Sequence, residues 1–237
     1  GAHIDGYIAD TATTVYFESE ETEESENENP EEKEKGTAEV ESEENEKKEM
    51  VQVIDQVLEE AINMVEPGVN VGEIGATIEK TAKKNGYNPI SNLTGHNLEK
   101  GSLHGGISIP NVEEDTEDEL EEGDVVALEP FITNGEGKVE DMPEVYIFRT
   151  LGSKDISGRM ARQTFRTIKS NYGNLPFAER WLTKDLSRIR LQMTLRELLS
   201  SEAIHPYYVL KEVEDGQVAQ AEHTMIVTSE GCEVTTR

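Results

Sequence analysis

The sequence predicts a mixed α+β fold, because segments with helical spacing of apolar residues are separated by short runs typical of strands. Two helices are expected in the first half of the chain, over Met50–Val65 and Val71–Ala82. Short apolar runs at Val125–Leu128 and Val145–Phe148 predict strands. The chain has 237 residues, which suits one domain, or one domain with a substantial insertion.

Residues 1–17 predict two short strands folded on each other, with Asp5-Gly6 as the turn. Asp10 is unusual in this hairpin because aspartate is depleted in strands. A buried carboxylate must be hydrogen-bonded or must bind a metal. From this stretch alone, a satisfied core aspartate and a metal ligand both remain open.

Residues 18–48 form an acidic run of low complexity, with 15 Glu and 4 Lys. The run has too few apolar side chains to offset the entropy lost on ordering, so we expect a disordered insert. An acidic interaction tail is the alternative.

The net charge of −28 argues against DNA or another nucleic acid as a partner, and against an anionic membrane surface. No apolar run approaches the ~20 residues needed to span a bilayer, so no membrane partner is expected. The single cysteine, Cys232, excludes an internal disulfide and fits a reducing cytoplasm.

Residues 157–201 differ from the rest of the chain in composition, because they are its least acidic part. They contain two patterns of apolar residues with helical spacing. A hairpin is predicted to follow over residues 207–227, with its turn at Glu214–Gly216. Helices followed by a hairpin resemble a winged helix. We therefore expect the helical segment 157–201 to be distinct from residues 1–156 and 202–237.

Four polar residues stand where strand residues are expected: Asp10, His96, Glu129 and Glu222. Each of these residues alone could serve a structural role, because a lone histidine more often makes a hydrogen bond than binds a metal ion. Together, three carboxylates and one imidazole are suitable ligands for a divalent metal ion. The excess of carboxylates suits a site with two ions.

Five motifs occur in a characteristic order: G-A-H-I-D-G-Y-I-A-D-T-A, N-L-T-G-H, L-H-G-G-I-S-I-P, A-L-E-P-F and A-Q-A-E-H-T. In this order they closely resemble the type II methionine aminopeptidases, the archaeal form above all. The resemblance implies the pita-bread fold, a curved antiparallel sheet with helices on one side. It also implies a monomeric cytoplasmic enzyme that removes the initiator methionine from nascent polypeptides with two divalent ions (Co, Mn, Fe, Zn or Ni).

Residue by residue, the resemblance makes Asp10 and Glu222 the carboxylates that bridge two ions, with His96 and Glu129 on one of them. Glu129 would also transfer the proton during hydrolysis. His104 matches a histidine that contacts substrate without binding metal, and it would stabilise the reacting carbonyl. Glu222 follows Glu129 by 93 positions, a spacing that matches the type II insertion and disfavours a prolidase-like dipeptidase. The resemblance thus implies a pita-bread catalytic domain of residues 1–156 and 202–237, interrupted by a helical insertion at 157–201.

The chain departs from the family pattern at its start, because the family's first metal aspartate would lie just before Gly1. We therefore expect an N-terminally truncated fragment, which truncation could leave inactive. The alternative function is a pita-bread protein that binds the ribosome or RNA and has lost catalysis. Such a protein would be expected to have substituted several metal ligands, whereas four are kept here.

Overall fold

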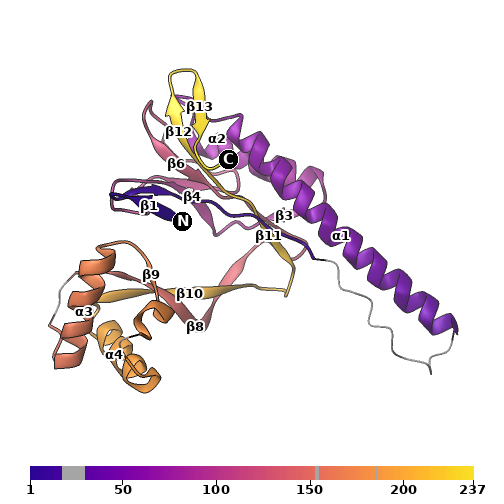
Figure 1. The fold of residues 1–237 in the computed structure, drawn as a ribbon. Helices are drawn as coiled ribbons and strands as arrows, with labels where there is room; N and C mark the ends of the chain where they lie inside the picture. Colours follow the sequence, from indigo (N-terminus) through magenta and orange to yellow (C-terminus); the bar gives the residue numbers. More distant parts are fainter. Residues whose placement is uncertain (18–29, 153–154, 185) are drawn as a thin grey trace. The chain divides into compact units, whose positions relative to one another are not determined.

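The computed structural model describes residues 1–17, 30–152, 155–184 and 186–237, and of residues 30–41 only the backbone (Figure 1). The chain forms two compact units. The larger unit comprises Asp10–His96, Ile107–Lys138 and Glu212–Arg237, and the smaller unit comprises Gly1–Ala9, Asn97–Gly106 and Val139–Lys211. Within the described ranges, no helix is long and apolar enough to cross a membrane.

The larger unit contains two sheets. Its strands are β3 (Asn88–Pro89), β4 (Thr94–Asn97), β5 (Ser108–Pro110), β6 (Val125–Leu128), β7 (Phe131–Thr133), β11 (Val218–Gln220), β12 (His223–Thr228) and β13 (Gly231–Val234). One sheet has the order β13-β12-β6-β4-β5 and the other the order β11-β7-β3. Strand β12 is antiparallel to both β6 and β13, and β4 is antiparallel to β5. The strand predicted at Val125–Leu128 is confirmed as β6.

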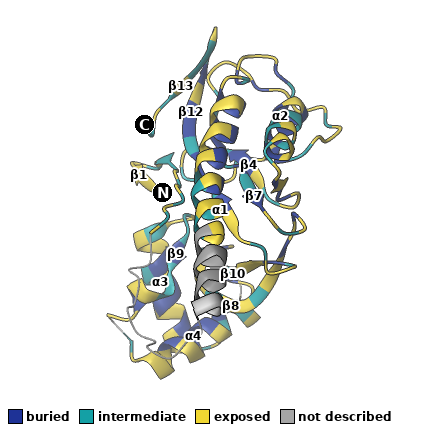
Figure 2. Ribbon diagram, turned by 90° about the vertical axis from the view of Figure 1, so that its right-hand side faces the viewer, coloured by how far each residue is buried: buried dark blue, intermediate teal, exposed yellow. Residues whose placement is uncertain are grey.

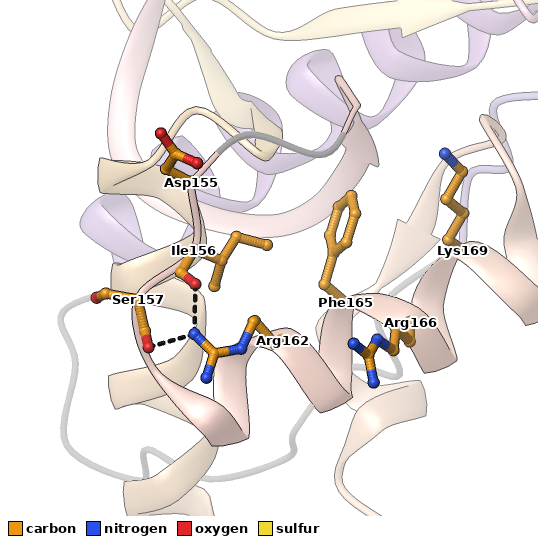
Figure 3. Close-up of a pocket in the computed structure, with 7 residues that line it drawn as sticks. All are labelled: Asp155, Ile156, Ser157, Arg162, Phe165, Arg166 and Lys169. Carbon is orange, nitrogen blue, oxygen red and sulfur yellow. Dashed lines mark hydrogen bonds between the residues drawn. The ribbon is translucent and has the colours of Figure 1, made fainter.

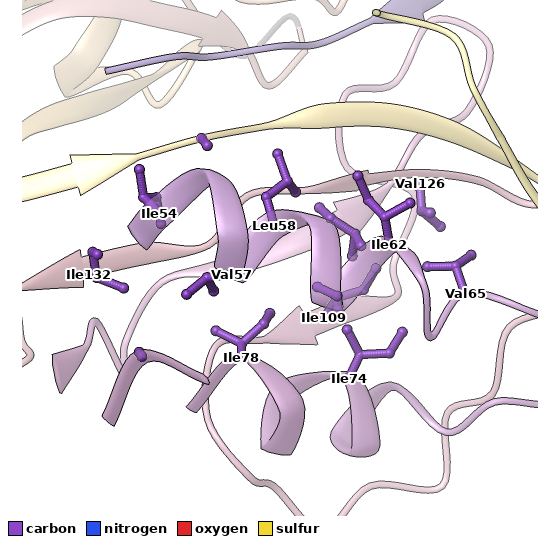
Figure 4. Close-up of a cluster of buried hydrophobic side chains, with 14 of the residues drawn as sticks. Ile54, Val57, Leu58, Ile62, Val65, Ile74, Ile78, Ile109, Val126 and Ile132 are labelled. Atoms are coloured by element: carbon purple, nitrogen blue, oxygen red, sulfur yellow. The ribbon is translucent and has the colours of Figure 1, made fainter. Parts of the chain in front are cut away.

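Helices α1 (Pro30–Ile62) and α2 (Val71–Lys84) supply the helical side of this unit's core. Their buried Ile54, Val57 and Ile78 belong to one apolar cluster with Ile109 of β5 and Ile132 of β7 (Figure 4). The described part of α1 has buried and exposed faces, as Figure 2 shows. Both predicted helices are thus confirmed, because their apolar spacing places one face of each in the core.

The acidic run was expected to be disordered, and the structure differs from this over its second part. Residues 30–48 belong to α1, while residues 18–29 lie outside the described residues. Glutamate and lysine are strong helix formers, and the run continues directly into an amphipathic segment that packs in the core. Within this part, Glu46 accepts two hydrogen bonds. Tyr87 Oη donates to its carbonyl oxygen at 3.3 Å, and Asn134 Nδ2 donates to its Oε1 at 2.9 Å.

The smaller unit has its own sheet and helices. Its elements are β1 (Ala2–Ile4), β2 (Tyr7–Ala9), β8 (Val139–Thr150), α3 (Arg159–Tyr172), β9 (Phe177–Ala178), η1 (Glu179–Leu182), α4 (Arg188–Ser200) and β10 (Ile204–Glu212). The sheet order is β10-β8-β9. Phe165 and Ile168 of α3, Leu191 of α4, Phe148 of β8 and Phe177 form a second apolar core. The predicted helical segment therefore packs together with β8 and β10.

The predicted hairpin over residues 207–227 is wrong. Strand β10 pairs with β8, whereas β11 pairs with β7, so the two strands that flank the Glu214–Gly216 turn belong to different sheets. Glu212, the last residue of β10, accepts hydrogen bonds from Glu214 N and Gly216 N, and the chain leaves this turn toward β7. Turn residues in the sequence predict that the chain reverses direction, but they do not predict which strands the flanking segments pair with.

The predicted hairpin at the start of the chain is confirmed in its first part. Strands β1 and β2 are antiparallel, and Asp5 and Gly6 form the turn with φ of 52° and 88°. The second strand was expected to continue toward Phe17, but β2 ends at Ala9, and the segment from Thr11 to Phe17 makes only an isolated bridge, from Ala12 to Glu222. Asp10 therefore lies just after β2.

Candidate metal centre

Two of the predicted site residues extend from the same face of the five-stranded sheet. Side chains alternate between faces along a strand, and directly paired residues share a face. Leu128 of β6 lies in the core, so Ala127 and Glu129 take the opposite face. Thr224 of β12 pairs with Ala127, and Glu222 lies two residues before it. Glu129 and Glu222 therefore emerge on the face away from the helices.

The same ladder sets Glu129 and Glu222 directly opposite each other. His223 pairs with Leu128, and Ala221 N donates to Pro130 O at 3.4 Å, so the register continues past the strand ends. Like charges that face each other across an antiparallel pair repel. The sheet thus holds two carboxyl groups in a position that costs stability unless a cation or a proton is shared.

His96 reaches this face through β4. Gly95 pairs with Ile109, which lies in the core, so His96 takes the opposite face with Ser108. A Cβ on residue 95 would lie 2.5 Å from the carbonyl oxygen of Ala127, which only glycine avoids. The absence of a side chain at Gly95 lets β4 approach β6 closely, and His96 Nε2 lies 3.4 Å from Glu129 Oε1.

Asp10 is fixed beside β12 by its backbone. Asp10 N donates to Thr224 Oγ1 at 2.7 Å, and that hydroxyl in turn donates to Asp10 O at 2.7 Å. Thr11 Oγ1 donates to Glu222 O at 2.8 Å. Asp10, His96, Glu129 and Glu222, hereafter the carboxylate–histidine cluster, thus share one region of the larger unit.

The electrostatics of the cluster are those of carboxylates held together away from water. Burial, followed by the charges of Glu222 and Asp10, raises the pKa of Glu129 from 4.5 to about 8. Burial and the charge of Asp10 raise the pKa of Glu222 to about 7. Both shifts mean that the folded chain disfavours the charged carboxylates in the absence of a compensating cation.

The donor chemistry of the cluster fits a divalent cation. Glu222 Oε1 is buried without a hydrogen-bond partner within the described structure, and three carboxylates with one imidazole suit Mn, Co, Fe, Zn or Ni. As they stand, however, no three His, Cys, Asp or Glu side chains of the described residues are arranged to hold an ion. The convergence of all four side chains on one point therefore stays a prediction.

His104 belongs to the smaller unit, in the loop after β4. Its carbonyl accepts from Ser102 Oγ at 2.9 Å, and Gly105 N donates to Asn97 O at 3.0 Å, which fixes the loop locally. Its predicted place beside substrate stays a prediction.

Two residues next to the cluster were missed in the sequence. Gln220 Nε2 donates to Glu129 Oε2 at 3.3 Å, and Thr224 holds the backbone of Asp10. A signal was present, because Gln220, Glu222 and Thr224 recur at every second residue of a strand-like segment. That spacing marks a polar face in a strand whose other face is buried.

Residues 1–229 match the model of metallopeptidase family M24. The chain is 44% identical over 236 residues to the methionine aminopeptidase of Methanothermobacter thermautotrophicus, covering 100% of this chain and 71% of that protein. It is 39% identical over 237 residues to the methionine aminopeptidase of Thermococcus onnurineus, with 100% and 72% covered.

Solved structures with the same fold include a thermophilic Arx1, with a TM-score of 0.65 at 20% identity, covering 77% of this chain and 54% of that one. The methionine aminopeptidase of Thermotoga maritima gives a TM-score of 0.51 at 22% identity, with 81% and 52% covered. These likenesses confirm the predicted pita-bread fold. With a family match over nearly the whole length and archaeal relatives matched throughout, the chain belongs to metallopeptidase family M24.

Proposed function

We propose that the chain is a type II methionine aminopeptidase, which hydrolyses the peptide bond after an N-terminal methionine of nascent polypeptides. The observation that supports this most directly is the carboxylate–histidine cluster on the sheet face away from the core. The archaeal methionine aminopeptidases, 44% to 32% identical over the whole chain, favour this function over an inactive binding protein. Such a substrate would place the enzyme in the cytoplasm.

The family uses divalent metal, and we infer two ions here. Asp10, His96, Glu129 and Glu222 would hold these ions, with the carboxylates of Asp10 and Glu222 contributing to both and His96 and Glu129 to one. When bound, divalent ions would polarise the peptide carbonyl and lower the pKa of a water molecule. Glu222 Oε1 would gain an electrostatic partner, which the described residues do not supply.

Glu129 would move the proton. Its carboxyl group would accept a proton from water and deliver it to the amide nitrogen of the leaving peptide. The donation from Gln220 Nε2 to Glu129 Oε2 orients that carboxyl group, which leaves Oε1 directed toward His96. His104 would donate a hydrogen bond to the reacting carbonyl oxygen.

The test compares Glu222→Gln with Glu122→Gln, a control that removes the same charge from an exposed position. Titration calorimetry with Mn²⁺ or Co²⁺ measures binding independently of turnover, and methionine release from a Met-Ala-Ser peptide measures activity. We expect Glu222→Gln to weaken metal binding at least tenfold and the control to match the unaltered chain. Equal affinity for all three proteins would refute the assignment of Glu222.

A further inference from the structure

The smaller unit contains a region of net positive charge within an otherwise acidic chain. Residues 157–201 hold nine basic and three acidic residues, a net charge of +6 within a chain of −28. Helix α3 contributes four of the cations and has no acidic residue. The overall acidity that argued against phosphate-bearing partners is therefore not a property of this region.

The cations of α3 lie along one helical strip. Arg159, Arg162, Arg166 and Lys169 are spaced three or four residues apart and are all exposed. Like charges at this spacing destabilise a helix. Within the described residues, the side chains of Arg159, Arg166 and Lys169 make no ion pair or hydrogen bond, although the chain contains 50 acidic residues. Three of the four cations of the strip are thus left without an ion pair among the described residues.

A cavity of about 450 Å³ opens beside this strip. Ile156 and Phe165 give it an apolar wall, and Arg162, Arg166 and Lys169 line it with three cations (Figure 3). Among the lining residues that the structure describes, Asp155 is the one acid, so the cations outnumber the acids there. A concave site with an apolar wall and a few polar groups is the usual form of a small-ligand pocket.

Arg162 is held in place for binding. Its Nη1 donates to Ile156 O at 2.8 Å and also to Ser157 O, as the dashed lines in Figure 3 show. A guanidinium has five N–H donors, so the remaining ones stay available. In the same view the guanidinium of Arg166, one helical turn further on, lies on the same side of α3 as that of Arg162. Each planar guanidinium can donate two parallel hydrogen bonds to two oxygens of a tetrahedral phosphate, so this pair of side chains suits a phosphate ligand.

We propose that the pocket formed by Arg162, Arg166 and Lys169 is a binding site for phosphate groups. The shared chemistry is a phosphate oxyanion, supplied either by a small phosphorylated molecule or by the phosphodiester backbone of RNA. The apolar wall of Ile156 and Phe165 gives room for the nonphosphate part of the ligand. The proposal does not depend on the aminopeptidase reaction, since every residue in it belongs to the smaller unit.

The test uses Arg166→Gln/Lys169→Gln, because neither side chain makes a hydrogen bond within the part of the chain that the structure describes. The matched control is Lys80→Gln/Lys84→Gln on exposed positions of α2, which changes the net charge equally. Pyrophosphate binding is measured by calorimetry, and a fluorescent 12-nucleotide RNA is followed by anisotropy, both at low salt. Circular dichroism verifies that each variant is folded.

We expect one of the two probes to bind, with at least a tenfold loss in Arg166→Gln/Lys169→Gln and less than a twofold loss in the control. Binding of pyrophosphate would identify a small phosphorylated ligand, and binding of the RNA alone would identify the phosphodiester backbone. The proposal is overturned if neither probe binds, or if both double variants lose affinity equally, because general charge would then explain the result.

Discussion

Glu212 offers the sharpest test of how the larger unit positions its cluster. This buried carboxylate accepts hydrogen bonds from Gly137 N at 3.2 Å, Glu214 N at 2.8 Å and Gly216 N at 2.9 Å. It thereby ties the turn after β7 to the turn before β11. These strands pair, and β11 leads directly to Glu222.

We predict that Glu212→Gln lowers the free energy of unfolding by about 3 kcal/mol at pH 7. The amide of glutamine has only one oxygen that can accept hydrogen bonds. Its NH₂ group would face backbone N–H groups that now donate to the carboxylate, and those donors would lose their acceptor. Hydrogen bonds to a charged group contribute about 1.5–3 kcal/mol each, and a buried donor left unpaired costs about 1–3 kcal/mol. Glu214→Gln is the control, because its side chain is exposed and the change should stay within about 0.5 kcal/mol.

The effect should depend on pH with a definite sign. Burial alone would raise the pKa of Glu212, but the backbone N–H groups of Gly216, Glu214, Gly137 and Glu136 hold it below the ordinary 4.5. Because the native pKa is lower than the unfolded one, the carboxylate contributes stability above pH 4.5. That contribution is lost as the pH falls through the native pKa, so the difference between the two proteins should shrink in acid.

Urea unfolding followed by far-ultraviolet circular dichroism at several pH values measures this difference. The single tryptophan, Trp181, lies in η1 of the smaller unit, so its fluorescence follows that unit separately. A difference between unaltered chain and Glu212→Gln that stays constant from pH 7 down to pH 3 would refute the reasoning. So would an equal loss in Glu214→Gln.

Three further changes test the strand contacts and the core. Gly95→Ala should displace β4 from β6, because its methyl would meet Ala127 O at 2.5 Å; we expect a loss of about 1–3 kcal/mol in urea unfolding and weaker Mn²⁺ binding. Thr224→Val should cost about 1–3 kcal/mol, since Asp10 N and O lose their partner, and unchanged stability would contradict this. Ile54→Ala should cost about 2–5 kcal/mol in the same assay, while Gln56→Ala on the exposed face of α1 should cost far less.

The sequence predicted those parts of the fold that depend on local pattern. Apolar spacing located α1 and α2, an uninterrupted apolar run located β6, and Asp5-Gly6 located the first turn. The prediction of disorder was wrong over residues 30–48. Their low hydrophobicity suggested disorder, but their glutamates and lysines extend helix α1, whose later turns pack in the core. Helix formation is cooperative, so a packed segment can extend into a polar one.

Strand pairing could not be predicted, since it depends on residues distant in sequence. The predicted hairpin over residues 207–227 was wrong because β10 pairs with β8 and β11 pairs with β7. The turn residues between β10 and β11 do not indicate these partners. The cluster residues were selected because they are polar at strand positions, which is a local signal. Their shared face follows from the pairing of β12 with β6 and of β4 with β5, which only the structure gives.

The cluster and the core are two faces of the same strands, and this explains how the fold tolerates its carboxylates. Val126 and Met225 are fully buried on the core face, and they pair with each other across β6 and β12. Their burial contributes about 1.5–3 kcal/mol per side chain and keeps the register that sets Glu129 opposite Glu222. A one-residue slip would move the carboxylates into the core, which is prohibitively costly. The apolar face therefore holds the repelling carboxylates in position, and a cation bound between them would convert that repulsion into stability of the folded chain.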